Sequence, residues 1–411
     1  MSGVDGNKKV PAIRFAGFSG EWEVNHLGDI CNETYGGGTP STSNQEFWGQ
    51  GIPWIQSSDI VENILENVHP RKKITEQGLN KSAAKLIPEY SIAIVTRVGV
   101  GKLSLMKEKY ATSQDFISLS KLTINILYAT YSIWNMLQYE KLAVQGTSIK
   151  GITKEELLSK KILYPESKKE QTKIGNYFQQ LDTLIAQHQQ KHEKLQNIKK
   201  ALLEKCFPKQ GEHTPELRFK GFSGAWDEKA LGDVADIVGG GTPSTQISEY
   251  WGGDINWYSP TEIGKNVYAE KSEKKITIKG LEKSSARMLP ANKTVLFTSR
   301  AGIGDMAILV KDGCTNQGFQ SFILNEGYDT YFIYSAGFLI KNYSLMYSSG
   351  STFLEISGKQ LEKMNMKVPS EKEQTKIGNL FQQLDTLINQ QQTQLGKLKN
   401  IKQACLEKMF V

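Results

Sequence analysis

A segment of 17 residues occurs twice in this chain with a single difference. Residues 169–185 read KEQTKIGNYFQQLDTLI and residues 372–388 read KEQTKIGNLFQQLDTLI, so that only Tyr177 and Leu380 differ. The offset of about 203 residues extends outward, because GGGTPST at 36–42 returns at 239–245. Solenoid repeats are much shorter, at ~20–50 residues. The chain is therefore a duplicated unit, and each copy joins a globular part to a helix.

Each globular part ends at a proline, Pro165 in the first copy and Pro369 in the second. Strand-like runs such as SIAIVT at 91–96 alternate with helical stretches such as 128–137, which predicts a mixed fold. We expect an α/β (α+β) protein in which two globular domains are joined by a pair of long antiparallel coiled-coil helices with pseudo-two-fold symmetry. The predicted domains are 1–165, 166–211 (first helix and linker), 212–368 and 369–411 (second helix).

In both helical segments the apolar residues step by three and four over about five heptads, which is typical of a coiled-coil seam. One apolar stripe needs a partner, and an antiparallel pairing with the other copy returns the chain to its second globular part. Buried polar residues can fix the register of such a pair, so we expect His188 and Gln391 near its midpoint. The predicted seam residues are Ile174, Phe178, Leu181, Ile185, His188, Leu195, Ile377, Phe381, Leu384, Ile388, Gln391 and Leu395, with Ile198 and Ile401 on the same stripe.

Bulk composition sets outer limits on function. The net charge is +7, which permits a nucleic-acid partner without requiring one. Residues 166–211 alone carry nine Lys against five acids, so a DNA surface on the globular parts would be a local patch. Cys31, Cys206 and Cys405 stand opposite Val234, Met409 and Leu202, which argues against a zinc or disulfide framework. The sequence has no membrane-length apolar run and its first residues lack the apolar core of a signal peptide, so we expect a cytosolic protein.

Tests for catalytic motifs fail. No Pro-Pro pair is present, so the motif with which adenine methyltransferases hold a flipped base is missing. The glycine-rich run before Lys102 has Thr96 and Leu103 where a phosphate-binding loop needs Gly and Ser or Thr. His188 and His192 have the spacing of a helical metal pair, but the other helix has no such pair, and we interpret them as structural. We therefore expect a protein that is not an enzyme and binds no metal.

Divergence between the copies is uneven. Residues 195–207 match 398–410 at 9 of 13 positions, whereas IQSSD at 55–59 stands opposite YSPTE at 258–262. Equal helices and unequal globular parts imply one kind of partner bound twice and two different targets, each read once.

Four motifs recur in the same order in both copies: the opening Pro-x-x-Arg-Phe…Gly-Phe…Trp, the Gly-Gly-Thr-Pro-Ser loop, the Arg-x-Gly-x-Gly turn and the Lys-Glu-Gln-Thr-Lys-Ile-Gly helix. Together they resemble the specificity subunit of type I restriction-modification systems, over residues 11–410. The resemblance implies two target recognition domains that each read half of a bipartite double-stranded DNA site. It implies a helical spacer that docks two methyltransferase subunits, which restriction motor-endonuclease subunits join. S-adenosylmethionine, ATP and Mg would belong to those partners. The alternative is a coiled-coil assembly scaffold without DNA binding; a self-contained nuclease or methyltransferase is a more remote rival.

The candidate DNA-binding residues fall into two groups. Divergent positions should carry sequence choice, and they are Gln56, Ser57, Ser58 and Lys150 in the first copy and Tyr258, Ser259, Thr261 and Glu262 in the second. Shared positions cannot explain different choices, and they are Gly37, Gly38, Thr39, Ser41, Lys72, Lys73, Arg97 and Gln114 with Gly240, Gly241, Thr242, Ser244, Lys274, Lys275, Arg300 and Gln317.

Each shared group has a plain structural alternative. The glycine loops offer amides to phosphates or are scaffold turns. The lysines face phosphates or only solvent. The arginines contact DNA or form a salt bridge that fixes their turn. The glutamines read bases or are buried amides that hold a loop.

Overall fold

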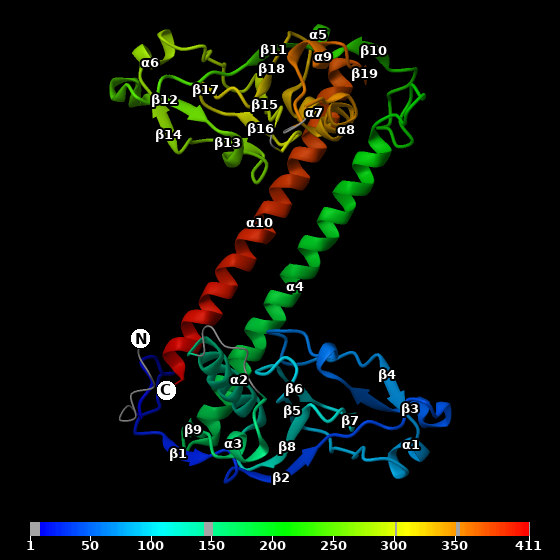
Figure 1. The fold of residues 1–411 in the computed structure, drawn as a ribbon, viewed down its shortest axis with the longest axis vertical. Coiled ribbons are helices and arrows are strands. Elements are labelled where there is room, and N and C mark those ends of the chain that lie inside the picture. Colours follow the sequence, from blue (N-terminus) through cyan, green and yellow to red (C-terminus); the bar gives the residue numbers. More distant parts are fainter. Residues whose placement is uncertain (1–8, 144–150, 301, 351–353, 411) are drawn as a thin grey trace. The chain divides into compact units, whose positions relative to one another are not determined.

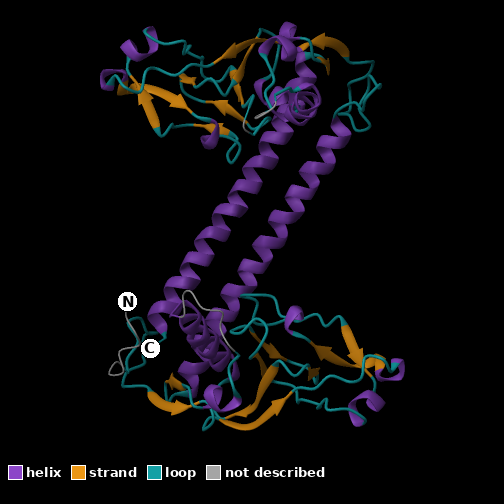
Figure 2. Ribbon diagram, in the orientation of Figure 1, coloured by secondary structure: helices purple, strands orange, loops and turns teal. Residues whose placement is uncertain are grey.

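The computed structural model describes residues 9–143, 151–300, 302–350 and 354–410 (Figures 1 and 2). The chain divides into two compact units, Met1–Gln189 with Thr393–Val411 as unit 1 and Gln190–Gln392 as unit 2. The division passes through both long helices, α4 (Lys168–Cys206) and α10 (Glu371–Met409), so each unit contains part of each. We call residues 9–165 head 1 and residues 212–368 head 2.

Head 1 contains two main sheets and a terminal strand pair. The larger sheet has the order β2-β8-β5-β6 and is antiparallel throughout; in the smaller sheet, β3 pairs antiparallel with β4 and parallel with β7. The strands are β1 (Glu23–His26), β2 (Cys31–Gly36), β3 (Trp48–Ile55), β4 (Lys72–Ile74), β5 (Ser91–Val95), β6 (Leu103–Met106), β7 (Ala111–Thr112), β8 (Phe116–Leu122) and β9 (Lys161–Tyr164). The helices are η1 (Gln45–Phe47), η2 (Ser57–Asp59), α1 (Glu76–Asn80), α2 (Ile126–Ala143) and α3 (Lys154–Leu158).

Head 2 repeats this plan. Its larger sheet has the order β11-β18-β15-β16-β13, in which the added strand β13 pairs parallel with β16 and the other pairs are antiparallel. Its smaller sheet has the order β14-β12-β17, with the same directions as in head 1. The strands are β10 (Asp227–Ala230), β11 (Ala235–Gly239), β12 (Trp251–Tyr258), β13 (Tyr268–Ala269), β14 (Lys274–Ile276), β15 (Thr294–Phe297), β16 (Met306–Leu309), β17 (Gly313–Thr315), β18 (Gln320–Leu324) and β19 (Asn365–Val368). The helices are α5 (Leu231–Val234), η3 (Ser248–Tyr250), η4 (Pro260–Glu262), α6 (Ile278–Glu282), α7 (Thr330–Ser335), α8 (Gly337–Tyr347) and α9 (Gly358–Glu362). The predicted mixed α/β fold is confirmed.

The core of each unit joins the head to both long helices. In unit 1, Phe178 of α4 stacks on Phe410 with ring centroids 5.4 Å apart, and Phe410 also meets Tyr128 of α2 at 5.6 Å. In unit 2, Phe207 takes the corresponding place between Phe332 and Phe381. Aromatic side chains of this size bury the most apolar surface per residue. The last turn of each long helix is therefore part of the core of one head.

In each copy the opening motif is held to the start of the long helix by an arginine–glutamate ion pair. Arg14 donates two hydrogen bonds to the Glu170 carboxylate at 2.6 and 2.7 Å, and Arg218 does the same to Glu373 at 2.8 Å each. Both carboxylates are buried. A bidentate pair of this kind fixes geometry as well as charge.

Pairing within each unit shows that the long helices run antiparallel. In unit 1, Asp182 lies 2.5 Å from the Lys402 ammonium, and Tyr177, which precedes it, contacts Cys405, which follows. In unit 2, Asp385 and Lys199 form the equivalent ion pair at 2.5 Å. Each aspartate also accepts a hydrogen bond from a tyrosine hydroxyl of its head, Tyr131 or Tyr331. The predicted antiparallel pair is confirmed.

Twelve predicted seam residues are buried or half-buried. The placement of Ile198 and Ile401 on the buried stripe is wrong, because these residues are 39% and 45% exposed. A straight helix has 3.6 residues per turn, whereas the three-four pattern repeats every 3.5 residues. Positions extrapolated along the pattern therefore move gradually off the buried face. Lys402 lies on that face instead, at 8% exposure, with its ammonium 5.2 Å from the Trp134 ring centre. His188 and Gln391 belong to different units, and their proximity stays a prediction.

Candidate nucleic-acid interface

The smaller sheet of each head lies at the end of that head opposite to the helices that follow β8 and β18 (Figure 1). The glycine loops, the lysine pairs and the divergent five-residue stretches all belong to this end or border it. The sequence predicted these groups separately, and the fold brings them together in both heads.

Two tryptophans fasten the glycine loop to the smaller sheet. In head 1 the indole N–H of Trp48 donates to the Ser41 carbonyl and that of Trp54 to the Gly38 carbonyl, both at 3.0 Å. The two rings meet edge to face at 5.0 Å. In head 2, Trp251 and Trp257 make the same bonds to Ser244 and Gly241, with the rings 5.1 Å apart. The loop is thus held in one conformation in both copies.

The glycines in this loop are positions where two backbone segments cross. A Cβ atom on Gly37 would lie 1.8 Å from the Ser113 carbonyl oxygen, and one on Gly38 would lie 2.3 Å from the Ala83 carbonyl. Gly240 and Gly241 are equally crowded. The Gly38 amide donates to the Thr112 carbonyl at 2.8 Å, as Gly241 does to Thr315. These contacts support the scaffold alternative for the glycines.

The loop's outer side carries hydroxyls and the predicted glutamines. Thr39 donates to the Gln114 side-chain oxygen at 2.6 Å, and Thr242 donates to Gln317 at 2.5 Å. Both glutamines are exposed, so the expectation of a buried amide is wrong, although each amide does hold its loop. Each glutamine lies in the short turn between two strands and not within a strand. Ser41 and Ser244 are exposed as well.

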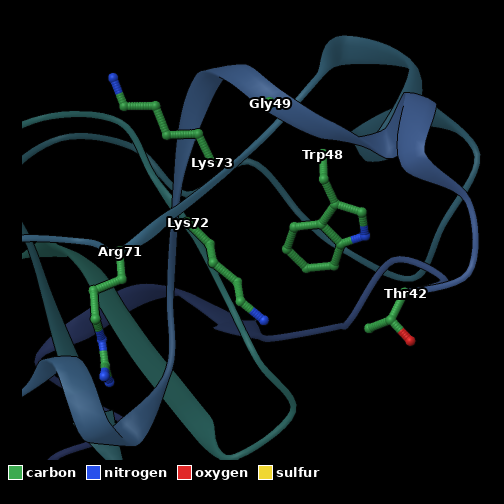
Figure 3. A pocket seen from close by; sticks show the side chains of 6 residues that line it. All are labelled: Thr42, Trp48, Gly49, Arg71, Lys72 and Lys73. Carbon is green, nitrogen blue, oxygen red and sulfur yellow. The ribbon is translucent and has the colours of Figure 1, made fainter.

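A hollow of about 340 Å³ lies beside Trp48 in head 1 and is lined by Thr42, Trp48, Gly49, Arg71, Lys72 and Lys73 (Figure 3). Lys72 extends toward the indole, with its ammonium 5.3 Å from the Trp48 ring centre and 5.9 Å from that of Trp54. Lys73 points to the other side of β4, because neighbouring strand residues alternate. In head 2, Lys274 lies 5.9 Å from Trp251. We call Trp48, Trp54 and Lys72, with Trp251, Trp257 and Lys274, the indole–lysine site of each head.

Sequence reasoning missed the tryptophans and Arg71 as site residues. The Trp-Gly pair recurs in both copies at 48–49 and 251–252, which was the available signal. Arg71 occurs in one copy only, so comparison of the copies could not flag it. Its guanidinium Nε donates to buried Asp59 at 2.7 Å, and Nη2 donates to the Ser58 hydroxyl.

The divergent residues border the site, but some have exposed side chains and others are engaged in hydrogen bonds within their own loop. Gln56 is the N-cap of η2, and Ser57 and Ser58 are the first residues of this helix, with Ser58 exposed. In head 2 Thr261 is exposed, whereas the Glu262 carboxylate accepts from the backbone N–H groups of Ser259 and Glu273. The Ser259 hydroxyl also donates to it.

The prediction that Tyr258 contacts DNA is wrong, because Tyr258 is 1% exposed and its hydroxyl donates to the Ala269 carbonyl. Its counterpart Ile55 is equally buried, so this divergence repacks the interior. Lys150 lies outside the described residues.

The arginines of the two turns differ. Arg300 lies 3.9 Å from the Glu355 carboxylate, which fits the salt-bridge alternative. Arg97 is exposed, and the residue equivalent to Glu355 in head 1 is Gly151. The equivalence follows from the next residue in each head, because the Ile152 backbone N–H donates to the Thr96 carbonyl as that of Ile356 donates to the Ser299 carbonyl. Within the described ranges the structure gives Arg97 no acidic partner. Nor does any group of three His, Cys, Asp or Glu side chains in those ranges have the placement of a metal site.

Residues 19–197 and 224–400 each match the family model described as the type I restriction modification DNA specificity domain. The chain belongs to this family. It therefore carries two copies of a specificity domain, one per head with its helix, and the resemblance drawn from the motifs is confirmed.

Several relatives are named as specificity subunits. The chain is 36% identical over 193 residues to the type I restriction enzyme MjaIX specificity subunit of Methanocaldococcus jannaschii, an overlap of 45% of this chain and 44% of that protein. It is 32% identical over 182 residues to the EcoR124I/EcoR124II specificity subunit of Escherichia coli, covering 42% and 44%. In these two matches the chain spans less than half of the relative's length. A weaker match, 21% over 383 residues, covers 90% of this chain and 88% of the putative MjaX specificity subunit of M. jannaschii.

Solved structures share the fold over nearly the whole chain. The S subunit of a type I restriction-modification system from M. genitalium superposes with a TM-score of 0.66 at 15% identity, over 98% of this chain and 99% of that one. No helix within the described ranges combines the length and apolarity that crossing a membrane needs.

Proposed function

We propose that this chain is the sequence-specific DNA-recognition subunit of a type I restriction-modification complex, in which each head reads one half of a bipartite site. The observation that carries this proposal is the indole–lysine site, which recurs on the same backbone frame in both heads beside loops that differ. Phosphate contacts set the position of a protein on DNA, whereas base contacts specify the sequence. The shared cationic site would supply the phosphate contacts, and the divergent loop beside it would supply the base contacts.

The lysine of this site is suited to a DNA phosphate. Lys72 and Lys274 are exposed, and contact with the indole ring restrains a side chain that would otherwise lose rotamer freedom on binding. The exposed hydroxyls of Ser58 in head 1 and Thr261 in head 2 stand at divergent positions where groove contacts would differ.

We assign the long helices to partner docking. The near-identity of 169–185 and 372–388 gives the chain two copies of one helical surface, which suits two methyltransferase subunits and, through them, restriction motor subunits. S-adenosylmethionine, ATP and Mg would act in those partners, and the chain itself would have no catalytic role. A complex that acts on cellular DNA would work in the cytoplasm.

Salt-dependent binding to duplex DNA tests the proposal. Each phosphate contact steepens the slope of log K against log salt by ~0.9. The Lys72→Ala, Lys274→Ala double variant should lower the slope by about 1.8. Lys169→Ala with Lys372→Ala is the matched control, because both are exposed helix lysines at equivalent places in the two copies. Absence of DNA binding by the chain, with and without its methyltransferase partner, would favour the pure scaffold.

A further inference from the structure

The two indole–lysine sites differ in charge at one equivalent position. Arg71 precedes Lys72 in head 1, and Glu273 precedes Lys274 in head 2. The strand register is the same, because Trp54 stands opposite Lys72 and Trp257 opposite Lys274. Arg71 and Glu273 therefore stand at the same place relative to the paired strands.

The surroundings of the two residues reinforce this difference. In head 1, Arg71 reaches the buried Asp59 carboxylate, while 61% of its own side chain stays exposed along the hollow. In head 2, the equivalent carboxylate of Glu262 accepts from the Glu273 backbone N–H at 2.6 Å, so the exposed Glu273 side chain adds a second negative charge. Head 1 thus carries Arg71 paired with a buried carboxylate beside Lys72, whereas head 2 carries the exposed carboxylate of Glu273 beside Lys274.

Arg71 is also restrained in a way that selects its ligand. Its Nε and Nη2 groups are engaged by Asp59 and Ser58, and Nη1 makes no hydrogen bond within the described residues. Readout of guanine by arginine uses two parallel N–H donors. A guanidinium with its fork already occupied suits a single phosphate oxygen better than a base edge.

We propose that the two heads hold the DNA backbone unequally: Arg71 supplies head 1 with a phosphate contact that head 2 lacks, and Glu273 repels a phosphate at the equivalent place. This inference rests on the proposed function and deepens it. Head 1 is the stronger electrostatic anchor, and head 2 depends more on its base contacts.

Reciprocal charge exchange in the full chain tests the inference, with a 30-base-pair duplex of random sequence as the probe. Non-specific binding is supplied almost wholly by phosphate contacts, so the recognised sequence need not be known. Arg71→Glu should lower the salt slope by ~0.9 or more, and Glu273→Arg should raise it by ~0.9. Glu273→Arg leaves Asp59 and its partners untouched, so it remains informative if Arg71→Glu fails to fold; Arg71→Gln is the milder replacement.

The outcomes separate the two proposals. A wild-type chain that does not bind the duplex removes the proposed function and the inference together. A wild-type chain that binds with a slope unchanged by Glu273→Arg and by Arg71→Gln keeps the proposed function and overturns the inference. An effect of the exchanges on affinity for the methyltransferase, but not for DNA, would also overturn it and assign the site to an acidic protein surface.

Discussion

Gly38 shows how a residue proposed for ligand binding can be required first by the fold. Its backbone N–H donates a hydrogen bond to the Thr112 carbonyl, and its carbonyl accepts one from the Trp54 indole N–H. A Cβ atom there would lie 2.3 Å from the backbone carbonyl of Ala83. The sequence could locate this loop because it recurs, but recurrence alone does not separate a scaffold glycine from a binding one.

We predict that Gly38→Ala destabilises unit 1 by about 1–3 kcal/mol, the usual cost of forcing atoms into a packed site. Gly36→Ala is the matched control, since a Cβ at Gly36 meets nothing within 4 Å. Thermal unfolding of both variants checks this. Equal midpoints for the two would contradict the crossing that the structure places at Gly38.

Burial protects one thiol from titration. It raises the pKa of Cys314 to about 12, and the counterpart residue in head 1 is Ala111. The folded state therefore keeps this proton when the unfolded chain, with a thiol pKa of about 8.5, would release it. The stability contributed by protonated Cys314 is full below about pH 8.5 and falls as pH rises toward 12.

At pH 9 we accordingly expect an alkylating reagent to modify half-buried Cys405 before Cys314, which should react only on unfolding. Mass spectrometry of the labelled native protein measures the order. Cys314→Ala should remove the slowest-reacting thiol and leave the others unchanged. Early modification of Cys314 would show that this part of head 2 opens readily.

Among the elements, the long helices were the most predictable and the smaller sheet of each head the least. Three-four stepping located α4 and α10 and most of the seam, because apolar periodicity reports the buried face directly. The pattern could not find Lys402, since a lysine reads as a solvent-facing residue until its partner Asp182 is placed against it. The small sheet was also invisible, because β4 and β7 are too short for alternation to register.

The Asp182–Lys402 pair should stabilise the helix contact in unit 1. Asp182→Asn leaves the Lys402 ammonium buried without its counter-charge, and we expect a loss of about 3 kcal/mol in the free energy of unfolding. Adding Lys402→Met should restore part of it, with a coupling energy of about 1–3 kcal/mol in the double-mutant cycle.

Two comparisons control this experiment. Asp385→Asn removes the equivalent pair in unit 2, where Lys199 is more exposed than Lys402, so its effect should be smaller. Glu216→Gln removes an exposed pair with Lys205 and should change stability by under ~1 kcal/mol. Denaturant unfolding gives all values. An Asp182→Asn cost no larger than that of Glu216→Gln would mean that the pair does not hold the helices.

For the whole molecule, the duplication predicts the plan of the fold more fully than any single motif. Each unit takes the first part of one long helix and the last part of the other, so Phe410 packs into unit 1 and Phe207 into unit 2. The match of 195–207 with 398–410 at 9 of 13 positions fits these equivalent places in the two units. The sequence could not indicate which loop residues reach DNA, since that depends on how irregular turns present single side chains.

Deleting the second copy should therefore yield a chain that dimerises. In a fragment of residues 1–211, Phe207 from a second molecule can occupy the place that Phe410 takes in unit 1, because 9 of the 13 residues around it are the same. Sedimentation equilibrium should give a dimer that recognises a palindrome of one half-site. A folded fragment that stays monomeric at high concentration would count against this exchange.

We propose above that one chain reads two different half-sites, and a map of methylated adenines in DNA exposed to the chain assembled with its methyltransferase partner would test this. We expect a split motif with two unlike halves at a fixed gap, of which only one half changes when residues 212–368 are exchanged for another head. A continuous motif, or methylation that does not depend on this chain, would contradict it.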